Sequence, residues 1–499
     1  MNAIIKYTFF LFITLFLIHL GGCQQAAPAE ATATAQPPDR DLAGLIIPRG
    51  LINHSPLATP GYVLFTPLLS DSTFLINLRG EVVHIWQSDY GPSGWVYLKE
   101  NGILARGGKD PEEFGFEGGG AGGYLQEYNW DGELVWQFRM SSEKSLTHHD
   151  VAILPNGNYL AIAWEGKSRE QAIAAGRDPM QVSSKGIWPD WVVELKPEGK
   201  EDAEIVWEWH MWDHMVQDFD DTKAGYGDVS AHPELVDINL ITRADTSEHA
   251  PDLYHTNAIN YNPELDQIVL SSPGLDEILV IDHSTSIEEA AGHTGGRWGK
   301  GGDILYRWGN PENYQRGDST DRKLGGQHDV RWIPEGYPGE GNITVFNNNV
   351  PYARPGYSEV LELVTPFTDS GYTIDPGKPY GPESPVWRYV ASDTVSFYSP
   401  FISGAHRMPN GHTFIAEGAR GRFFEVNAEG QVLWEYLTPY AGTARLPDGR
   451  FPQPVGPYEY ATFRATHIPS DHPAVAGRIV EPLNPQPNIY VVEQDEDVD

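Results

Sequence analysis

Val82-Val83-His84-Ile85-Trp86 is the first of six short apolar stretches that end in tryptophan. Short stretches of this kind, rich in Val and Ile and bounded by polar turns, are typical of β-strands. Their recurrence predicts six structural repeats, each closing on a tryptophan. The other five stretches end at Trp136, Trp207, Trp308, Trp387 and Trp434.

A hairpin signal recurs out of phase with the tryptophans. Leu154-Pro155-Asn156-Gly157 and Met408-Pro409-Asn410-Gly411 each join two apolar runs, and Asn-Gly in such a position strongly indicates a hairpin. Repeats of short antiparallel strands are typical of propeller blades, which close radially. We therefore predict an all-β fold, a six-bladed β-propeller with loop insertions, over residues 43–490. Weaker hairpin signals occur at Asn101-Gly102, at 262–266 and around Pro334.

The spacing of the six tryptophans is uneven. Successive intervals are 50, 71, 101, 79 and 47 residues, whereas a blade needs about 40–50 residues. The longer intervals must therefore hold insertions, which we expect at 166–190, 210–250, 283–303 and 310–326.

The charge balance of the chain is strongly acidic. Among 499 residues, 34 are Lys or Arg and 69 are Asp or Glu, which gives a formal net charge of −35. Such a polyanion repels phosphate backbones and anionic lipid headgroups, which argues against nucleic-acid binding. Cys23 is the only cysteine, so neither an intrachain disulfide nor a cysteine metal cage can form.

The N-terminal segment predicts export. Residues 1–22 hold one positive charge and an apolar run of about twelve residues, shorter than the roughly 20 of a spanning helix. The run ends on Leu20-Gly21-Gly22-Cys23, which resembles a bacterial lipobox, so we expect Cys23 to be acylated after cleavage. In a Gram-negative source, Gln24 after the cysteine favours anchoring in the outer membrane, facing the periplasm. The alternative is a plain signal peptide with an incidental cysteine.

Two further segments outside the predicted propeller have a simple interpretation. Residues 23–42 are rich in Gln, Ala, Pro and Thr, which predicts a flexible tether between the acylated cysteine and the folded body. Residues 491–499 are acidic and are expected to form a solvated tail.

Four histidine clusters each precede a predicted hairpin. In a propeller the innermost strand of each blade faces the central channel, so histidines at matched places in several blades converge on one axial point. Side-chain alternation places His255 and Asn257 on the same face of their strand. Asp150 and Asp329 are expected to be strand-cap residues or inter-blade hydrogen-bond partners and not acids. The clusters are Thr147-His148-His149-Asp150, Tyr254-His255-Thr256-Asn257, Gln327-His328-Asp329 and Gly404-Ala405-His406-Arg407.

The segment His210-Met211-Trp212-Asp213-His214 has two histidines four residues apart, as in some metal motifs. However, it follows a predicted blade closure and is succeeded by the acidic residues Asp218, Asp220 and Asp221. We interpret it as a structural segment at the rim, and we predict no metal site.

The histidine clusters resemble those of the bacterial arylsulfate sulfotransferases, which are exported six-bladed propellers. The resemblance runs from about residue 60 to about residue 440 and is most specific at 148–158, 255–272 and 327–329. It implies transfer of a sulfuryl group from a phenolic sulfate ester to a phenol acceptor, without a nucleotide sulfate donor, a metal or an organic cofactor. It also implies a homodimer.

The resemblance assigns roles to the residues of the clusters. His328 matches the nucleophile that becomes transiently sulfated, and His149, His255 and Asn257 match groups that bind sulfate oxygens and assist proton transfer. His148, beside His149, is expected to contact the substrate. A neutral imidazole is a competent nucleophile near neutral pH because its ordinary pKa is about 6.5. A covalent intermediate divides one difficult displacement into two easier ones.

One feature of the family is missing. The family usually places an arginine that contacts sulfate soon after the Ser-Ser following the His-x-Asn strand, but here the sequence reads Ser271-Ser272-Pro273-Gly274. We expect Arg407, with His406 beside it as a further substrate contact, to supply the missing charge from another blade. Arg331 and Arg420 are the alternatives.

Two other functions stay open on the sequence alone. The four channel histidines could instead be ligands of zinc, copper or iron in a metal-dependent lyase or hydrolase, because imidazole suits all three metals. A non-enzymatic surface propeller could bind a carbohydrate, a quinone-like cofactor or a partner protein.

Overall fold

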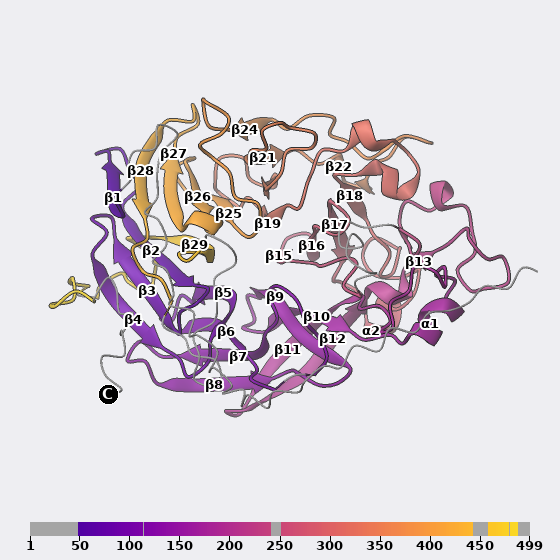
Figure 1. Ribbon diagram of the computed structural model, residues 1–499, viewed down its shortest axis with the longest axis horizontal. Helices are drawn as coiled ribbons and strands as arrows, with labels where there is room; N and C mark the ends of the chain where they lie inside the picture. Colours follow the sequence, from indigo (N-terminus) through magenta and orange to yellow (C-terminus); the bar gives the residue numbers. More distant parts are fainter. Residues whose placement is uncertain (1–47, 113, 241–250, 443–457, 479, 488–499) are drawn as a thin grey trace, which may run out of the picture. The chain divides into compact units, whose positions relative to one another are not determined.

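In a computed structural model of the chain, six antiparallel sheets surround a central axis (Figure 1). The structure describes residues 48–112, 114–240, 251–442, 458–478 and 480–487. Each sheet has four or five strands, which confirms the predicted six-bladed all-β propeller. The expected signal peptide, the acylated Cys23 with its tether, and the acidic tail lie outside the described residues.

The first three blades follow one another along the chain. Blade 1 contains β2 (Gly61–Pro67), β3 (Ser72–Asn77) and β4 (Val82–Gln87), with β29 (Thr462–Pro469) innermost. Blade 2 contains β5 (Pro92–Leu98), β6 (Leu104–Lys109), β7 (Gly123–Tyr128) and β8 (Leu134–Arg139). Blade 3 contains β9 (Ser145–Ile153), β10 (Tyr159–Glu165), β11 (Asp190–Glu198) and β12 (Asp202–His210).

The other three blades repeat this order. Blade 4 contains β15 (Ala258–Asn262), β16 (Gln267–Ser272), β17 (Glu277–Asp282) and β18 (Tyr306–Trp308). Blade 5 contains β19 (His328–Trp332), β20 (Ile343–Asn347), β21 (Glu359–Leu363) and β24 (Trp387–Tyr389). Blade 6 contains β25 (Gly404–Arg407), β26 (Thr413–Glu417), β27 (Arg422–Val426) and β28 (Val432–Leu437), with β1 (Gly50–His54) as an extra outer strand.

Insertions between these strands lie where the spacing predicted them. A fifth insertion, between β21 and β24, holds the hairpin of β22 (Phe367–Thr368) and β23 (Gly371–Tyr372) and was not predicted. The predicted insertions contain α1 (Arg169–Ala174), η1 (Met211–Asp213), β13 (Met215–Val216), η2 (Val229–Ala231), β14 (Val236–Asp237), α2 (Ile287–Ala290), η4 (Pro311–Tyr314) and η5 (Ser319–Asp321).

The six tryptophans that predicted the repeats all lie on the fourth strands of their blades. Each indole Nε1–H donates a hydrogen bond to the next blade around the ring, at 2.7–3.1 Å. The last of these bonds runs from Trp434 to the carbonyl of Leu78 and joins blade 6 to blade 1. The tryptophans therefore fasten every pair of neighbouring blades.

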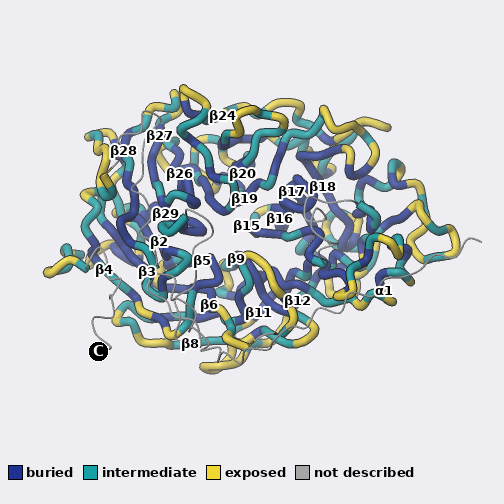
Figure 2. Tube along the Cα trace, viewed as in Figure 1, coloured by how far each residue is buried: buried dark blue, intermediate teal, exposed yellow. Residues whose placement is uncertain are grey.

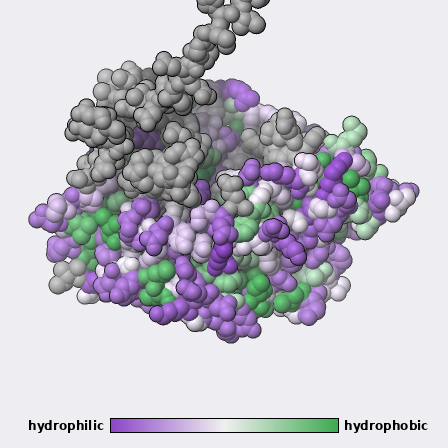
Figure 3. Space-filling view, turned by 60° about the horizontal axis from the view of Figure 1, so that its bottom comes forward, coloured by the Kyte–Doolittle hydropathy of each residue, from purple (hydrophilic) through white to green (hydrophobic). Residues whose placement is uncertain are grey.

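Hydrophobic side chains fill the spaces between neighbouring blades. One cluster, for example, joins Leu160 and Val192 of blade 3 to Ile268 and Leu279 of blade 4, and all four are fully buried. The strands are mostly buried and the loops exposed (Figure 2), and the face seen in Figure 3 carries mainly hydrophilic side chains. Within the described ranges, no helix is long and apolar enough to cross a membrane.

Blade 1 is completed by a strand from the far end of the chain. The C-terminal strand β29 pairs antiparallel with β2, in the register Tyr62↔Ile468 and Phe65↔Ala465. This pairing closes the ring and brings β29 beside the inner strands β5 and β25 of the two neighbouring blades (Figure 1).

Candidate active site

A buried layer of charged side chains joins the inner strands at the centre of the ring. The guanidinium group of Arg464, on β29, lies 2.5 Å from the carboxylate of Asp150 on β9 and 3.0 Å from that of Asp329 on β19. The three side chains are at most 5% exposed. Tyr97 of β5 donates its hydroxyl to Asp150 at 2.7 Å, and Arg331 donates to Asp329 at 2.7 Å. We call these five residues the central charge layer.

The remaining two blades contact this layer through their backbones. The amide of Ile259, on β15, donates to Asp150 at 3.3 Å, and the amide of Ala405, on β25, donates to Asp329 at 2.9 Å. All six blades therefore meet at two carboxylates. Of the two roles expected for Asp150 and Asp329, the structure shows that of inter-blade hydrogen-bond partners.

A pocket of about 680 Å³ opens on one side of the central charge layer. His149, His255 and His328 line it together with Phe463, so the structure brings together three of the four predicted channel histidines. His149, His328 and Phe463 each precede a member of the layer by one residue. The pocket thus lies on the side of the layer from which the inner strands enter it. We call it the histidine pocket.

His149 is held from behind by His148. The two Nδ1 atoms lie 2.8 Å apart, and the His148 ring stacks on Trp164 at 4.2 Å between centroids. His148 is 2% exposed and does not line the pocket, so the structure places it behind His149, which it orients, and not at the pocket surface where a substrate contact was expected. Burial, reinforced by the neighbouring imidazole of His255, lowers the pKa of His149 well below its ordinary value.

The pKa of His255 is shifted in the opposite direction to that of His149. Its Nδ1 bonds the carboxylate of Asp252, whose other oxygen accepts a 3.0 Å hydrogen bond from the indole of Trp164. Burial alone would lower the pKa of His255, but the charge and hydrogen bond of Asp252 outweigh it and raise the pKa. The ring centroids of His255 and His149 lie 4.5 Å apart. Two adjacent imidazoles therefore favour different protonation states.

His328 is held as a neutral imidazole. Its Nδ1 lies 2.8 Å from Oδ1 of Asn348 and 3.1 Å from the carbonyl of Gly326, both acceptors, so Nδ1 carries the proton. The lone pair is then on Nε2, which accepts a 3.1 Å hydrogen bond from the amide of Ile402. Burial, with the charge of Arg464, lowers the pKa of His328 to about 3.

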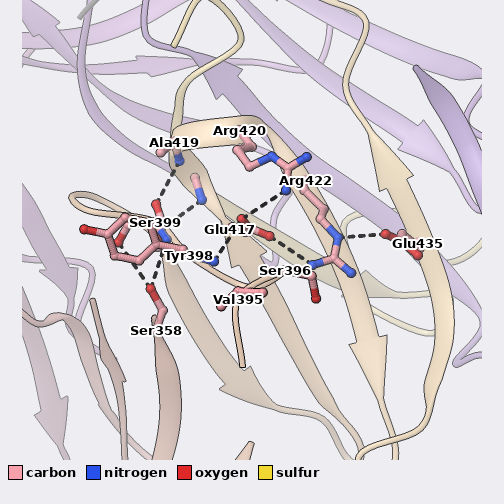
Figure 4. Close-up of polar contacts among 12 residues, drawn as sticks. Ser358, Val395, Ser396, Tyr398, Ser399, Glu417, Ala419, Arg420, Arg422 and Glu435 are labelled. Atoms are coloured by element: carbon pink, nitrogen blue, oxygen red, sulfur yellow. Dashed lines mark hydrogen bonds and ion pairs between the residues drawn. The ribbon is translucent and has the colours of Figure 1, made fainter. Parts of the chain in front are cut away.

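The segment that carries Ile402 is fixed by a polar network (Figure 4). Ser399 accepts a hydrogen bond from the amide of Ala419 at 3.1 Å and donates its own amide to Ser358 at 2.9 Å. The amide of Tyr398 donates to Glu417 at 3.3 Å, and Glu417 pairs with Arg422 at 2.9 Å (Figure 4).

Asn348 links this segment to His328. Its side-chain amide donates to the carbonyls of Ser399 and Ile402, both at 2.8 Å, while its oxygen accepts from the imidazole. One buried asparagine therefore sets both the tautomer of His328 and the position of the backbone opposite its lone pair.

Left-handed backbone conformations cluster at the histidine pocket. His149, His255 and Asp329 have φ values of 54°, 53° and 52°, and Ile402 and Ser403 have 50° and 94°. Such conformations cost about 1–3 kcal/mol each for non-glycine residues and persist where the surrounding structure imposes them. They turn the backbone at the places where the histidines meet.

Asn257 lies behind the pocket. It is fully buried, and its side-chain amide donates to the carbonyl of Gln327 at 2.9 Å, next to His328. Its Oδ1 has no hydrogen-bond partner in the described part of the chain. Asn257 does not line the pocket in this structure, and it joins the start of blade 4 to that of blade 5.

His406 and Arg407 lie on the other side of the central charge layer. They line a smaller pocket of about 190 Å³ with Arg331 and His467, and Arg407 pairs with the carboxylate of Glu362. The structure therefore does not bring His406 or Arg407, which were expected to contact the substrate, into the histidine pocket.

The alternatives to Arg407 do not lie in the histidine pocket either. Arg331 belongs to the central charge layer, and Arg420 lies 3.8 Å from Glu417. Pro273 and Gly274, at the place of the family arginine, do line the pocket. The place at which the family usually has an arginine therefore faces the pocket but carries no charge.

A cation that the sequence analysis missed supplies positive charge. Lys109, at the end of β6, is the one Lys or Arg among the described residues that line the histidine pocket. Its ammonium group has no hydrogen-bond or ion-pair partner in those residues. Lys109 is exposed overall, yet desolvation at the pocket lowers its pKa. It follows Gly107-Gly108 and no recognisable motif, so no sequence signal pointed to it.

The channel histidines are not arranged as a metal cage. Within the described residues, one cluster alone has three His, Cys, Asp or Glu ligand atoms within 4.8 Å of one another, namely His214, His293 and Asp303. None of these residues lines the histidine pocket. The geometry thus does not favour a metal-dependent lyase or hydrolase that uses His149, His255 and His328 as ligands.

Comparisons with known proteins give one family and several structural neighbours. The family model described as Arylsulfotransferase (ASST) matches residues 101–437. A protein of unknown function from Bacteroides caccae is 12% identical, with a TM-score of 0.41 over 76% of this chain and 94% of that one. Virginiamycin B lyase from Staphylococcus aureus is 8% identical, with a TM-score of 0.34 over 80% and 90% of the two chains. No curated protein matches.

Proposed function

Because the chain belongs to the arylsulfotransferase family, we propose that it moves a sulfuryl group from a phenolic sulfate ester to a phenol acceptor through a sulfated His328. The family membership supports aryl sulfate transfer without a nucleotide sulfate donor. The observation that carries the histidine mechanism is the neutral imidazole of His328, which shares a pocket with the differently biased His149 and His255.

The first half-reaction sulfates the enzyme. The lone pair on Nε2 of His328 attacks the sulfur, an N–S bond forms, and the S–O bond to the phenol breaks. His255, whose pKa is raised, donates its proton to the departing phenolate. The amide of Ile402 must release Nε2 before attack, since it occupies the lone pair at 3.1 Å.

The second half-reaction returns the sulfuryl group. Neutral His255 takes the proton of the acceptor phenol, the phenol oxygen attacks the sulfur, and the N–S bond breaks to restore neutral His328. His149 and Lys109 stabilise the charge on the sulfuryl oxygens in both halves. An unpaired cation matters here because the protein as a whole repels anions.

We further propose that the propeller is held at the outer membrane, facing the periplasm, by the acylated Cys23, and that it forms a homodimer. The lipobox-like Leu20-Gly21-Gly22-Cys23 supports the anchor, and the family resemblance supports the homodimer.

A chromogenic aryl sulfate tests the reaction. Incubation of 4-nitrophenyl sulfate with phenol should release nitrophenol together with an equal amount of phenyl sulfate. Release that does not depend on phenol means hydrolysis, and no release with or without phenol would contradict the proposed transfer.

Replacing Lys109 with methionine should lower kcat/KM for the aryl sulfate by about 10- to 100-fold, because a hydrogen bond to a charged group contributes about 1.5–3 kcal/mol. Lys109→Arg should stay within a few-fold of the unmodified protein. Lys99→Met is the control, since Lys99 pairs with Glu127 at 2.7 Å and does not line the pocket. A kcat/KM of Lys109→Met within twofold of this control would remove Lys109 from the site.

The rate of the first half-reaction should fall as the pH rises above neutrality, but it should not fall as the pH drops a few units below neutrality. His255 must be protonated, so the rate with phenyl sulfate falls as pH rises through its pKa, which lies above 6.5. His328 stays unprotonated down to about pH 3. In Asp252→Asn, the effect of burial on His255 is no longer opposed by a carboxylate, so the pKa of His255 falls. The decline in rate at high pH, which is the alkaline limb of the profile, should therefore move to lower pH. Single-turnover phenol release measures both profiles, and an unmoved limb would contradict the assignment.

A further inference from the structure

A second cluster of reactive side chains lies in the insertions between blades 3 and 4 and within blade 4. His214 directly follows η1, and His293 and Asp303 lie between α2 and β18. Nδ1 of His214 lies 2.9 Å from Oδ1 of Asp303, and Nδ1 of His293 lies 2.7 Å from the same oxygen. One carboxylate oxygen therefore faces two imidazoles.

Both ring nitrogens of His214 face hydrogen-bond acceptors, although a neutral imidazole carries only one proton. Its Nε2 lies 2.8 Å from the carbonyl of Ala290, which can only accept, so Nε2 carries a proton. In a neutral imidazole, Nδ1 is then an unprotonated acceptor, yet it faces a carboxylate oxygen. Either a second proton shared by Nδ1 and Asp303, or a metal ion that both atoms ligate from one side, must satisfy this pair.

The position of His214 is fixed by its surroundings. The ring is fully buried and stacks on Trp209, with 5.6 Å between the centroids and 4° between the planes. The Trp209 indole donates to the carbonyl of Gly302 at 2.7 Å. A Cβ at Gly302 would lie 2.5 Å from Nε2 of His214, so this glycine allows the backbone to contact the ring closely.

We propose that His214, His293 and Asp303 bind a divalent transition-metal ion, with zinc as the best match. Two imidazole nitrogens and a carboxylate oxygen are ligands that zinc prefers. A metal-bound histidine usually donates its other N–H to a carbonyl or carboxylate, as His214 does to Ala290. The ion takes the place of the second proton and fastens two insertions to each other.

This site differs from the one that the sequence motif suggested. His210 pairs with Glu165 at 3.0 Å and stacks on Trp191, away from His214. Of His210 and His214, only His214 belongs to the proposed metal site, and the second histidine ligand, His293, lies about eighty residues further along the chain. The exposed His293, at 61% of its side chain, leaves the solvent side of the ion open for water.

Zinc titration of the tag-free, chelator-treated chain tests the proposal. We expect one bound zinc per chain and, at about 100 times the Kd, a rise in the unfolding midpoint of about 3 °C or more. Magnesium should produce no comparable shift, because it prefers oxygen ligands. Absence of a zinc-dependent shift, or an equal shift with magnesium, would show that a second proton on His214 occupies the position instead.

The variant His293→Ala separates a metal site from a hydrogen-bonded triad. His293 is largely exposed, so the zinc-free variant should unfold within about 1 °C of the unmodified chain while its zinc affinity falls by about 100-fold or more. His232→Ala is the matched control, because His232 is also exposed, at 45%, and pairs with Glu234. Unchanged zinc affinity in His293→Ala would overturn the proposal. These readouts do not depend on sulfuryl transfer.

Discussion

Replacing His328 with alanine should lower turnover of an aryl sulfate with phenol by about 10⁴-fold or more, because loss of a covalent nucleophile removes the whole two-step route. Burst release of phenol from donor alone should disappear as well. Folding should survive, since the imidazole is replaced inside a pocket of about 680 Å³. The measurements are steady-state turnover and mass spectrometry of protein quenched with donor alone.

His406→Ala is the matched control for this experiment. His406 also lies on an inner strand and is half-buried, and desolvation lowers its pKa to about 3, so its imidazole is neutral. It lines the smaller pocket beyond the central charge layer, so the variant should keep the burst and the sulfated peptide. Sulfation mapped to His406 or His255 would give the nucleophile's role to that residue instead of His328.

Replacing Arg464 with methionine should destabilise the protein by about 3–5 kcal/mol, because it leaves two buried carboxylates without their shared cation. Asp150 and Asp329 are 1% and 2% exposed and contact every blade through the central charge layer. The midpoint of urea unfolding measures this loss.

An exposed ion pair provides the comparison. Arg79→Met removes a 2.8 Å pair with Glu81 in which the side chains are 67% and 39% exposed, and it should cost less than about 1 kcal/mol. If Arg464→Met costs no more than Arg79→Met, the central charge layer does not hold the blades together.

The blades were predictable because a local pattern repeats. All six tryptophans lie on fourth strands because the indole there donates a hydrogen bond to the next blade and packs against it. Each interface between blades therefore places a tryptophan at the corresponding position of the sequence. The turn signals were predictable for the same reason, since Asn-Gly at 156–157 and 410–411 joins first to second strands. The hairpin of β22 and β23 carried no such pattern.

The position of His406 could not be predicted from the sequence. The amide of Ile402 reaches His328 and that of Ala405 reaches Asp329, so Ile402 is level with the pocket and His406 lies beyond the layer. In blade 6 the cluster histidine therefore follows the residue that contacts the layer, whereas His149, His255 and His328 precede such a residue in their blades. Matched cluster positions in the sequence could not reveal that shift, since Ile402 and Ser403 turn the backbone there.

Lys109 and Arg464 were missed because neither belongs to a recognisable motif. Both reach the centre through ring closure, Lys109 from blade 2 and Arg464 from the end of the chain. Two buried carboxylates imply a cation nearby, but the sequence does not say which of 34 Lys and Arg residues supplies it.

Closure of blade 1 by β29 has a consequence for how this protein is made. A nascent chain that has not yet left the ribosome beyond Thr462 lacks the inner strand of its first blade, Phe463 and the cation of Arg464. Five blades can pair their own strands by then, yet the ring stays open and Asp150 and Asp329 stay uncompensated. A premature stop codon between His328 and this strand therefore leaves the histidine pocket incomplete, although His149, His255 and His328 have already been synthesised.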